Sequence, residues 1–180
     1  MNRLMAISAA ARCGMWALLL SSAALTMPAL ALAQDVSEYG MKAVLFYRLS
    51  QFVYWPGAQP APRPTILCVV GRNPFGSALS QIDASSGDVT VRIAPTDLAA
   101  CHLLFIPRSE ASNLNNWLER SAARQMITVS DLPGFARAGG MIELPLEGER
   151  IGIVLNRSVA QGKGFEFNAQ LLRLARVIDP

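Results

Sequence analysis

The pattern of apolar and polar positions in the second half of the chain predicts paired strands. Apolar side chains alternate with other residues in 141–146 and again in 151–155, the period of two that gives a strand one apolar face. Only the polar, glycine-containing segment Glu147–Arg150 separates the two runs, so we expect an antiparallel hairpin. Pro145 has no amide proton for a central ladder, which places this hairpin at a sheet edge or a bulge.

Continuous apolar runs elsewhere predict buried strands, and runs with three- and four-residue periodicity predict helices between them. The buried strands are expected at Thr65–Val70, Cys101–Ile106 and Met126–Val129. Alternation in Asp88–Ala94 predicts a strand with one wetter face, and Phe165–Phe167 is expected to be extended. The helices are expected at Val36–Tyr54, from about Pro74 to Ile82, at Ala111–Arg124 and at Asn168–Ile178. This alternation is typical of a single-domain α/β sandwich with a mostly parallel sheet flanked by helices and an antiparallel edge hairpin.

The N-terminal residues have the features of a cleaved secretory signal. Arg3 and Arg12 precede an almost wholly apolar segment, and Ala31–Ala33 supplies a small-residue cleavage site. A membrane anchor is the alternative, which Pro28 within the apolar run disfavours. We therefore expect a signal peptide over residues 1–33 and one domain over residues 34–180.

The charge of the exported domain argues against nucleic acid as a partner. Residues 1–33 hold two arginines and no acidic residue, so the remaining chain has 14 basic and 13 acidic residues and a net charge of +1. The basic residues are spread along the sequence and form no stripe.

Two cysteines remain after signal cleavage, and their pairing has two interpretations. An even number of cysteines in an exported chain favours a disulfide between Cys68 and Cys101. The alternative is two buried thiols, because both residues stand in or beside apolar runs. If the two runs are adjacent parallel strands, their Cα atoms could lie within the roughly 4.4–6.8 Å that a disulfide needs.

No group of residues with catalytic or metal-binding spacing stands out. His102 is the only histidine, and its neighbour Cys101 points to the opposite face of a strand. Ser130 and Asp131 have no histidine partner, and Asp131 is expected to cap the loop before Pro133. The chain is therefore expected to be neither an enzyme nor a cofactor or metal protein.

A set of spaced motifs across the mature chain resembles the YfiR family of periplasmic proteins. The motifs are Ser37–Tyr39, Lys42-Ala43, Phe46-Tyr47, Phe52-Val53, Trp55-Pro56, Cys68–Gly71, Asn73–Gly76, Cys101–Ile106, Thr128–Asp131, Phe135-Ala136, Gly139–Ile142 and Leu171–Val177. The resemblance implies a periplasmic repressor that binds the periplasmic domain of an inner-membrane diguanylate cyclase and lowers cyclic di-GMP output. It also implies sequestration by an outer-membrane lipoprotein.

The resemblance also bears on the cysteines. Cys68 and Cys101 match one disulfide of the family. A second pair that some members carry near the hairpin has no counterpart here, which puts redox switching in question.

Four aromatic residues are candidate anchors for a protein partner. They are Tyr54, Trp55, Phe135 and Phe165, each of which has a core position as its alternative. The apolar positions of the first helix are broad enough to make a homodimer plausible. A periplasmic small-molecule sensor or solute-binding module, with its pocket near Gly71–Gly76, is the alternative function.

Overall fold

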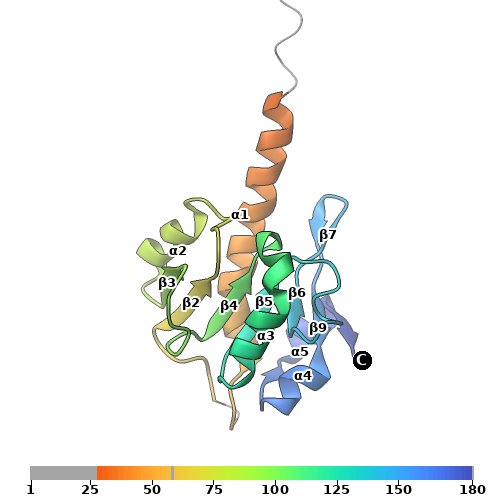
Figure 1. The fold of residues 1–180 in the computed structure, drawn as a ribbon. Coiled ribbons are helices and arrows are strands. Elements are labelled where there is room, and N and C mark those ends of the chain that lie inside the picture. The colour runs from red at the N-terminus through yellow and green to blue at the C-terminus, as the bar shows by residue number, and fades with distance from the viewer. Residues whose placement is uncertain (1–27, 58, 180) are drawn as a thin grey trace, which may run out of the picture. The chain divides into compact units, whose positions relative to one another are not determined.

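The computed structural model describes residues 28–57 and 59–179 (Figure 1). The predicted signal peptide, residues 1–33, lies mostly outside these residues. Within them, no helix is both long and apolar enough to cross a membrane.

Five α-helices and one short 3-10 helix are described. They are α1 (Pro28–Phe52), α2 (Ala78–Ser86), the 3-10 helix η1 (Arg108–Asn113), α3 (Leu114–Ala122), α4 (Arg157–Gly162) and α5 (Ala169–Leu174). The principal strands are β2 (Thr65–Val69), β3 (Val89–Ile93), β4 (Leu103–Ile106), β5 (Ile127–Ser130), β6 (Ile142–Glu143), β9 (Val154–Asn156) and β11 (Arg176–Ile178). Two small ladders pair β1 (Val53–Tyr54) with β10 (Glu166–Phe167) and β7 (Leu146–Glu147) with β8 (Arg150–Ile151).

The central sheet has the order β11-β9-β6-β5-β4-β2-β3. All of its neighbouring strands are parallel except β6 and β9, which pair antiparallel with Ile142 opposite Leu155. The predicted α/β fold is therefore confirmed, and so is the antiparallel hairpin close to one end of the sheet. Pro145 falls in the break between β6 and β7, where it interrupts no ladder.

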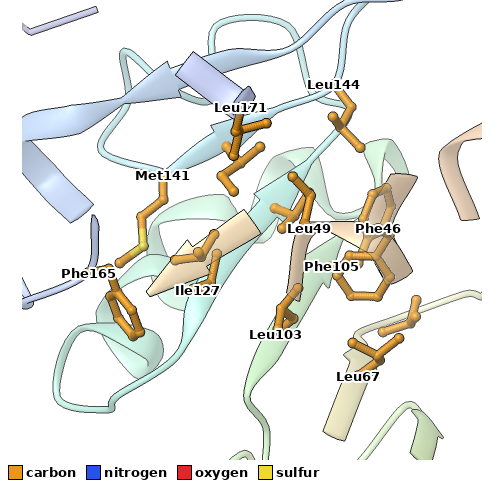
Figure 2. Packing of buried hydrophobic residues seen from close by; sticks show 14 of the residues in the cluster. Phe46, Leu49, Leu67, Leu103, Phe105, Ile127, Met141, Leu144, Phe165 and Leu171 are labelled. Carbon is orange, nitrogen blue, oxygen red and sulfur yellow. The ribbon is translucent and has the colours of Figure 1, made fainter. Parts of the chain in front are cut away.

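Alternation along the buried strands separates two apolar cores on the two faces of the sheet. One core joins α1 to one set of strand side chains (Figure 2), among them Phe46, Leu49, Leu67, Leu103, Phe105 and Ile127. The other core contains the intervening positions Cys68, Val70, Leu104 and Ile106. Leu114, Trp117 and Leu118 of α3 pack against this core. Strands buried on both faces explain why these runs are continuously apolar in the sequence.

The first and the last predicted helices both end earlier than expected. The first helix ends at Phe52, and Val53–Tyr54 extends into β1, because Trp55 precedes a proline and β-branched and aromatic residues favour strands. The final segment is not one helix over Asn168–Ile178. The chain leaves α5 at Ala175, and β11 then pairs with β9, which gives β9 a hydrogen-bonded neighbour on its outer side.

Candidate functional site

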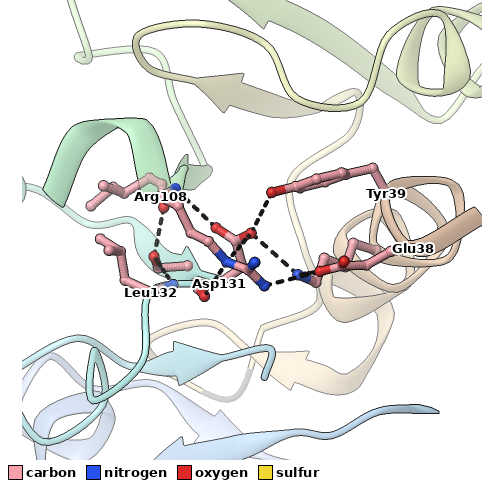
Figure 3. A network of polar contacts seen from close by, with 8 residues as sticks. Glu38, Tyr39, Arg108, Asp131 and Leu132 are labelled. Carbon is pink, nitrogen blue, oxygen red and sulfur yellow. Dashed lines mark hydrogen bonds and ion pairs between the residues drawn. The ribbon is translucent and has the colours of Figure 1, made fainter. Parts of the chain in front are cut away.

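A buried network of charged side chains lies where α1 crosses the carboxyl ends of β4 and β5 (Figure 3). Lys42, with no exposed surface, donates to Glu38 and to Asp131 Oδ2, the latter at 3.2 Å. Arg108 reaches both carboxylates, with Nη2 at 3.0 Å from Glu38 Oε1 and Nε at 3.2 Å from Asp131 Oδ2. Two cations are thus matched to two carboxylates, which allows Lys42 and Asp131 to be fully buried, whereas the Arg108 side chain is 43% exposed.

The local sequence explains why these groups meet. Glu38 and Lys42 are one helical turn apart, so both face the sheet from the same side of α1. Ile106 of β4 lies beside Ser130 of β5 in the parallel register, so the residues that follow these strand ends come together. The Arg108 backbone N–H donates to Asp131 Oδ1 at 3.1 Å, which completes the junction.

Tyr39 adds a phenol to the network. Its hydroxyl donates to Asp131 Oδ2 at 2.9 Å, and Lys42 Nζ lies 5.0 Å from the centre of its ring. Burial, and then the negative charge of Asp131, raise the pKa of Tyr39 well above its usual range. Tyr39 therefore stays protonated and acts as a hydrogen-bond donor.

The network satisfies its own charges, because each carboxylate in it contacts both Lys42 and Arg108. Asp131, expected to cap a loop, instead joins α1 to two strand ends. Ser130 Oγ donates to the Ile106 carbonyl at 2.6 Å and accepts from the Leu132 N–H at 3.0 Å, so it too is fully engaged. In the described part of the chain, no three His, Cys, Asp or Glu side chains form a possible metal site.

The opposite side of α1 presents apolar side chains to solvent. Met41 is 42% exposed and Val44 is 46% exposed, and they line an apolar groove of about 510 Å³. The groove, which we call the α1–hairpin groove, is lined by Gly40, Met41, Val44, Leu45, Glu149, Arg150 and Ile151. Leu146, which pairs with Ile151 across the β7–β8 hairpin, is 43% exposed and enlarges the same apolar surface. A hollow apolar surface with a charged rim is suited to binding another molecule.

The four predicted partner anchors separate into one exposed and three buried residues. Tyr54 is 45% exposed and remains available to a partner. Trp55 and Phe165 are buried and pack edge to face, with ring centres 5.5 Å apart. Because their rings already fill the core, Trp55 and Phe165 present no surface to a partner in this structure.

Phe135 is also a core residue rather than an exposed anchor. It has no exposed surface and packs with Leu132, Leu104 and the disulfide. Its ring occupies the space that a side chain at Gly140 would need, so this glycine allows the loop to fold over it. Glu143 holds the same loop by accepting the backbone N–H groups of Gly134 and Ala136.

The structure joins Cys68 and Cys101 in a disulfide with a Cα–Cα distance of 5.7 Å. The parallel pairing of β2 with β4 that this bond requires is present. Beside the disulfide, the ring nitrogen Nδ1 of His102 accepts the backbone N–H of Ile66 at 2.9 Å. The backbone N–H of His102 donates to the Ile66 carbonyl. His102 is thus a structural link between the two strands, as its place on a half-buried strand end suggests.

The turn at Gly71–Gly76 is the expected site of the alternative small-molecule function. Some of its hydrogen-bonding groups bond to one another within the turn. Asn73 accepts the Phe75 N–H and donates to the Gly76 carbonyl. A side chain at Gly71 would collide with Glu110, whose carboxylate accepts from Trp117 Nε1 at 2.8 Å.

Reasoning from the sequence missed the charged network, and it indicated apolar surface on the first helix without locating the α1–hairpin groove. The spacing of Glu38 and Lys42 was a usable signal, since an opposite-charge pair one turn apart stood on an otherwise apolar helix. Val44 carried a weaker signal, because it belongs to the broad apolar set of the first helix, which indicated either a deeply buried helix or apolar surface for another chain.

The described residues thus form an α/β domain with a closed polar network and an open apolar groove. The chain belongs to the YfiR/HmsC-like family, which it matches over residues 39–176. This is a regulatory family of periplasmic proteins in cyclic di-GMP signalling, and not a catalytic one.

Other comparisons add information on the fold alone. No curated protein matches the chain. Among solved structures, it is similar to the crystal structure of the ABC domain in complex with L-Trp from Streptococcus pneumonia, with 12% identity and a TM-score of 0.51. The match covers 78% of this chain and 60% of the solved chain, so this chain spans less than two thirds of the length of the solved chain.

Proposed function

We propose that residues 34–180, exported to the periplasm after signal cleavage, bind the periplasmic domain of an inner-membrane diguanylate cyclase and repress cyclic di-GMP synthesis. Membership of the YfiR/HmsC-like family supports the regulatory role. The observation that carries the binding role is the α1–hairpin groove, with its exposed Met41 and Val44.

The chemistry of the groove indicates the kind of contact that the cyclase makes. Its floor is apolar, so the partner contributes apolar side chains whose burial provides the favourable free energy. Glu149 and Arg150 at the rim carry opposite charges and orient the partner. Tyr54 lies outside the lining of this groove and can contribute a separate contact.

The charged network supports this role from behind the surface. Glu38 and Lys42 fix α1 to the strand ends, while Met41 and Val44 on the same helix face solvent. A rigid helix loses little conformational freedom on binding, so more of the interface energy is available as affinity. An outer-membrane lipoprotein that sequesters the protein would compete for the same apolar surface.

Cyclic di-GMP measurements in cells test the proposal. We expect deletion of the gene to raise cyclic di-GMP and wild-type protein to restore it. Val44→Glu should fail to restore it, because a carboxylate in the groove would lose its hydration on binding. The substitution leaves the helix supported, since Arg48 lies four residues further on as a favourable ion-pair partner.

Leu174→Glu is the matched control. Leu174 is the most exposed of the large apolar residues described, at 69%, and it does not line the groove. This variant should repress like the wild type at equal periplasmic level. If both variants repress normally, or if deletion leaves cyclic di-GMP unchanged, the proposed function is wrong.

A further inference from the structure

The three methionines of residues 34–180 differ in their exposure to solvent. Met126 and Met141 are 0% and 1% exposed, whereas Met41 is 42% exposed. The other four methionines of the chain precede residue 34, at Met1, Met5, Met15 and Met27. A small oxidant in solution therefore reaches Met41 in the folded domain, but it reaches Met126 and Met141 only after the core opens.

The position of Met41 makes its chemistry relevant to binding. Met41 lines the α1–hairpin groove, together with the apolar residues Val44 and Ile151. A Cβ atom at Gly40, which also lines the groove, would meet no other heavy atom within 4 Å, so the helix surface beside Met41 is uncovered. The groove thus holds an accessible thioether within the surface that the proposed function assigns to the cyclase.

No free thiol competes with this thioether in the described part of the chain. Thiolates react with peroxides faster than thioethers do, but Cys68 and Cys101 are the cysteines of this part and they form a disulfide. Both half-cystines are buried in the core on the other face of the sheet. Met41 is therefore the most accessible sulfur-containing side chain among the described residues.

We propose that Met41 is a site of reversible oxidation by peroxides, and that its sulfoxide releases the partner bound in the α1–hairpin groove. In the oxidation step, a sulfur lone pair forms a bond to one peroxide oxygen and the O–O bond breaks. The other oxygen takes up the remaining proton and leaves as water. Sulfur loses two electrons, which the peroxide gains. The inference rests on the proposed function, because the partner that is released is the cyclase domain.

The sulfoxide opposes binding because it places a polar oxygen in an apolar groove. A partner that covers Met41 with apolar side chains must remove water from this oxygen and offers no hydrogen bond in return. Oxidation therefore relieves the repression of the cyclase. Methionine sulfoxide reductases, one for each sulfoxide epimer, restore the thioether. A dithiol supplies the two electrons and becomes a disulfide, and the sulfoxide oxygen leaves as water.

Peptide mass spectrometry of the mature protein after treatment with hydrogen peroxide tests the modification site. We expect one added oxygen on the peptide that contains Met41, and unmodified peptides for Met126 and Met141. The same treatment in urea is the control, since unfolding should make all three methionines react alike. Equal oxidation of the three methionines in the folded protein overturns the assignment of Met41.

Calorimetric titration against the periplasmic domain of the cyclase tests the release, after the peroxide has been removed. We expect oxidation to raise the dissociation constant by about tenfold or more, because a polar group is then buried without a partner. Incubation with both reductases and a dithiol should return it to the untreated value. Met41→Leu has no sulfur at this position, so peroxide treatment should leave its own dissociation constant unchanged.

The outcomes separate this inference from the proposed function. Unchanged affinity of the protein oxidised at Met41 overturns the release, and so does an equal loss of affinity in treated Met41→Leu. Failure of the untreated wild type to bind the cyclase domain contradicts the proposed function and, with it, the release. That failure is recognised because it occurs before any oxidation, while mass spectrometry still reports the selectivity for Met41.

Discussion

At the scale of single residues, Lys42 is a fully buried charged side chain held by two ion pairs. Its ammonium group is fully buried between Glu38 and Asp131, and Tyr39 and Arg108 complete the surrounding contacts. Such a charge is tolerated only because each carboxylate has a partner. The network therefore fixes the position of α1 more strictly than apolar packing alone would.

We predict that Lys42→Met lowers the free energy of unfolding by about 3–5 kcal/mol, because it leaves carboxylates buried with less compensating charge. Urea unfolding followed by circular dichroism measures the change. Arg48→Met is the control on the same helix, since Arg48 is exposed and should change stability by no more than about 0.5 kcal/mol. Similar losses in both variants would contradict the role given to the network.

A second residue-level prediction concerns pH. Burial lowers the pKa of His102 from its ordinary value of 6.5, and its Nδ1 must be unprotonated to accept the Ile66 N–H. The unfolded chain then takes up this proton more readily than the folded chain. The contribution of His102 is complete above pH 6.5 and is lost as the pH falls through the folded-state pKa.

His102→Asn provides the comparison, because its amide oxygen can accept the same N–H without titrating. Thermal midpoints of both proteins should be measured between pH 7.5 and pH 5. We expect the wild type to lose stability relative to the variant as the pH falls below 6.5. A constant difference across this range would show that the Nδ1 contact contributes nothing that depends on protonation.

At the scale of elements, the Cys68–Cys101 disulfide joins β2 to the loop just before β4. The two half-cystines are 0% and 3% exposed, so a reductant in solution cannot reach either sulfur without local opening of the core. This arrangement favours a structural bond over a redox switch.

We predict that Cys68→Ala/Cys101→Ala destabilises the domain by roughly 3–4 kcal/mol, the loop-closure value for a sequence separation of 33. Urea unfolding of the double variant tests this. Thiol labelling should show that millimolar reductant leaves the bond intact in the folded wild type and breaks it in urea. Rapid reduction of the folded protein would instead support a regulatory bond.

The success of sequence reasoning also varied from one element to another. Continuous apolar runs predicted β2, β4 and β5 correctly, because burial on both faces leaves an unambiguous pattern. The segment 176–178 was assigned to a helix, since its three residues fit either period and only the free side of β9 decides the outcome. Long-range pairing of that kind is not encoded in local periodicity.

Functional surfaces were harder to predict than elements for the same physical reason. Phe135 and Phe165 fitted a partner interface by residue type, but tertiary packing places both in the core. Conversely, the breadth of the apolar set on the first helix allowed either deep burial or apolar surface, and Val44 of this set is exposed. An apolar residue type indicates that burial of the side chain is favourable. It does not indicate whether the side chain is buried by the same chain or by another molecule.

At the scale of the whole molecule, Met41 and the disulfide belong to different parts of the domain. Met41 lies in the α1–hairpin groove, which is formed by α1 and the β7–β8 hairpin. The disulfide lies in the core on the other face of the sheet and is attached to β2, the neighbour of β3. Figure 1 shows β3 at one end of the row of strands and β7 toward the other end. Sites that share no residues and no contacts are expected to act independently.

We therefore predict that binding and stability respond separately to changes at the two sites. Oxidation of Met41 should weaken cyclase binding but change the free energy of unfolding by no more than about 0.5 kcal/mol, because this side chain is exposed. Cys68→Ala/Cys101→Ala should lower the free energy of unfolding, while the folded protein keeps the wild-type affinity for the cyclase domain. Urea unfolding measures the stability, and calorimetric titration without urea measures the affinity. The oxidised double variant should show the sum of the separate free-energy changes, because no shared element connects the two sites. If oxidation of Met41 destabilises the domain as much as loss of the disulfide does, the weaker binding reports an altered fold, and Met41 is not a site of partner release.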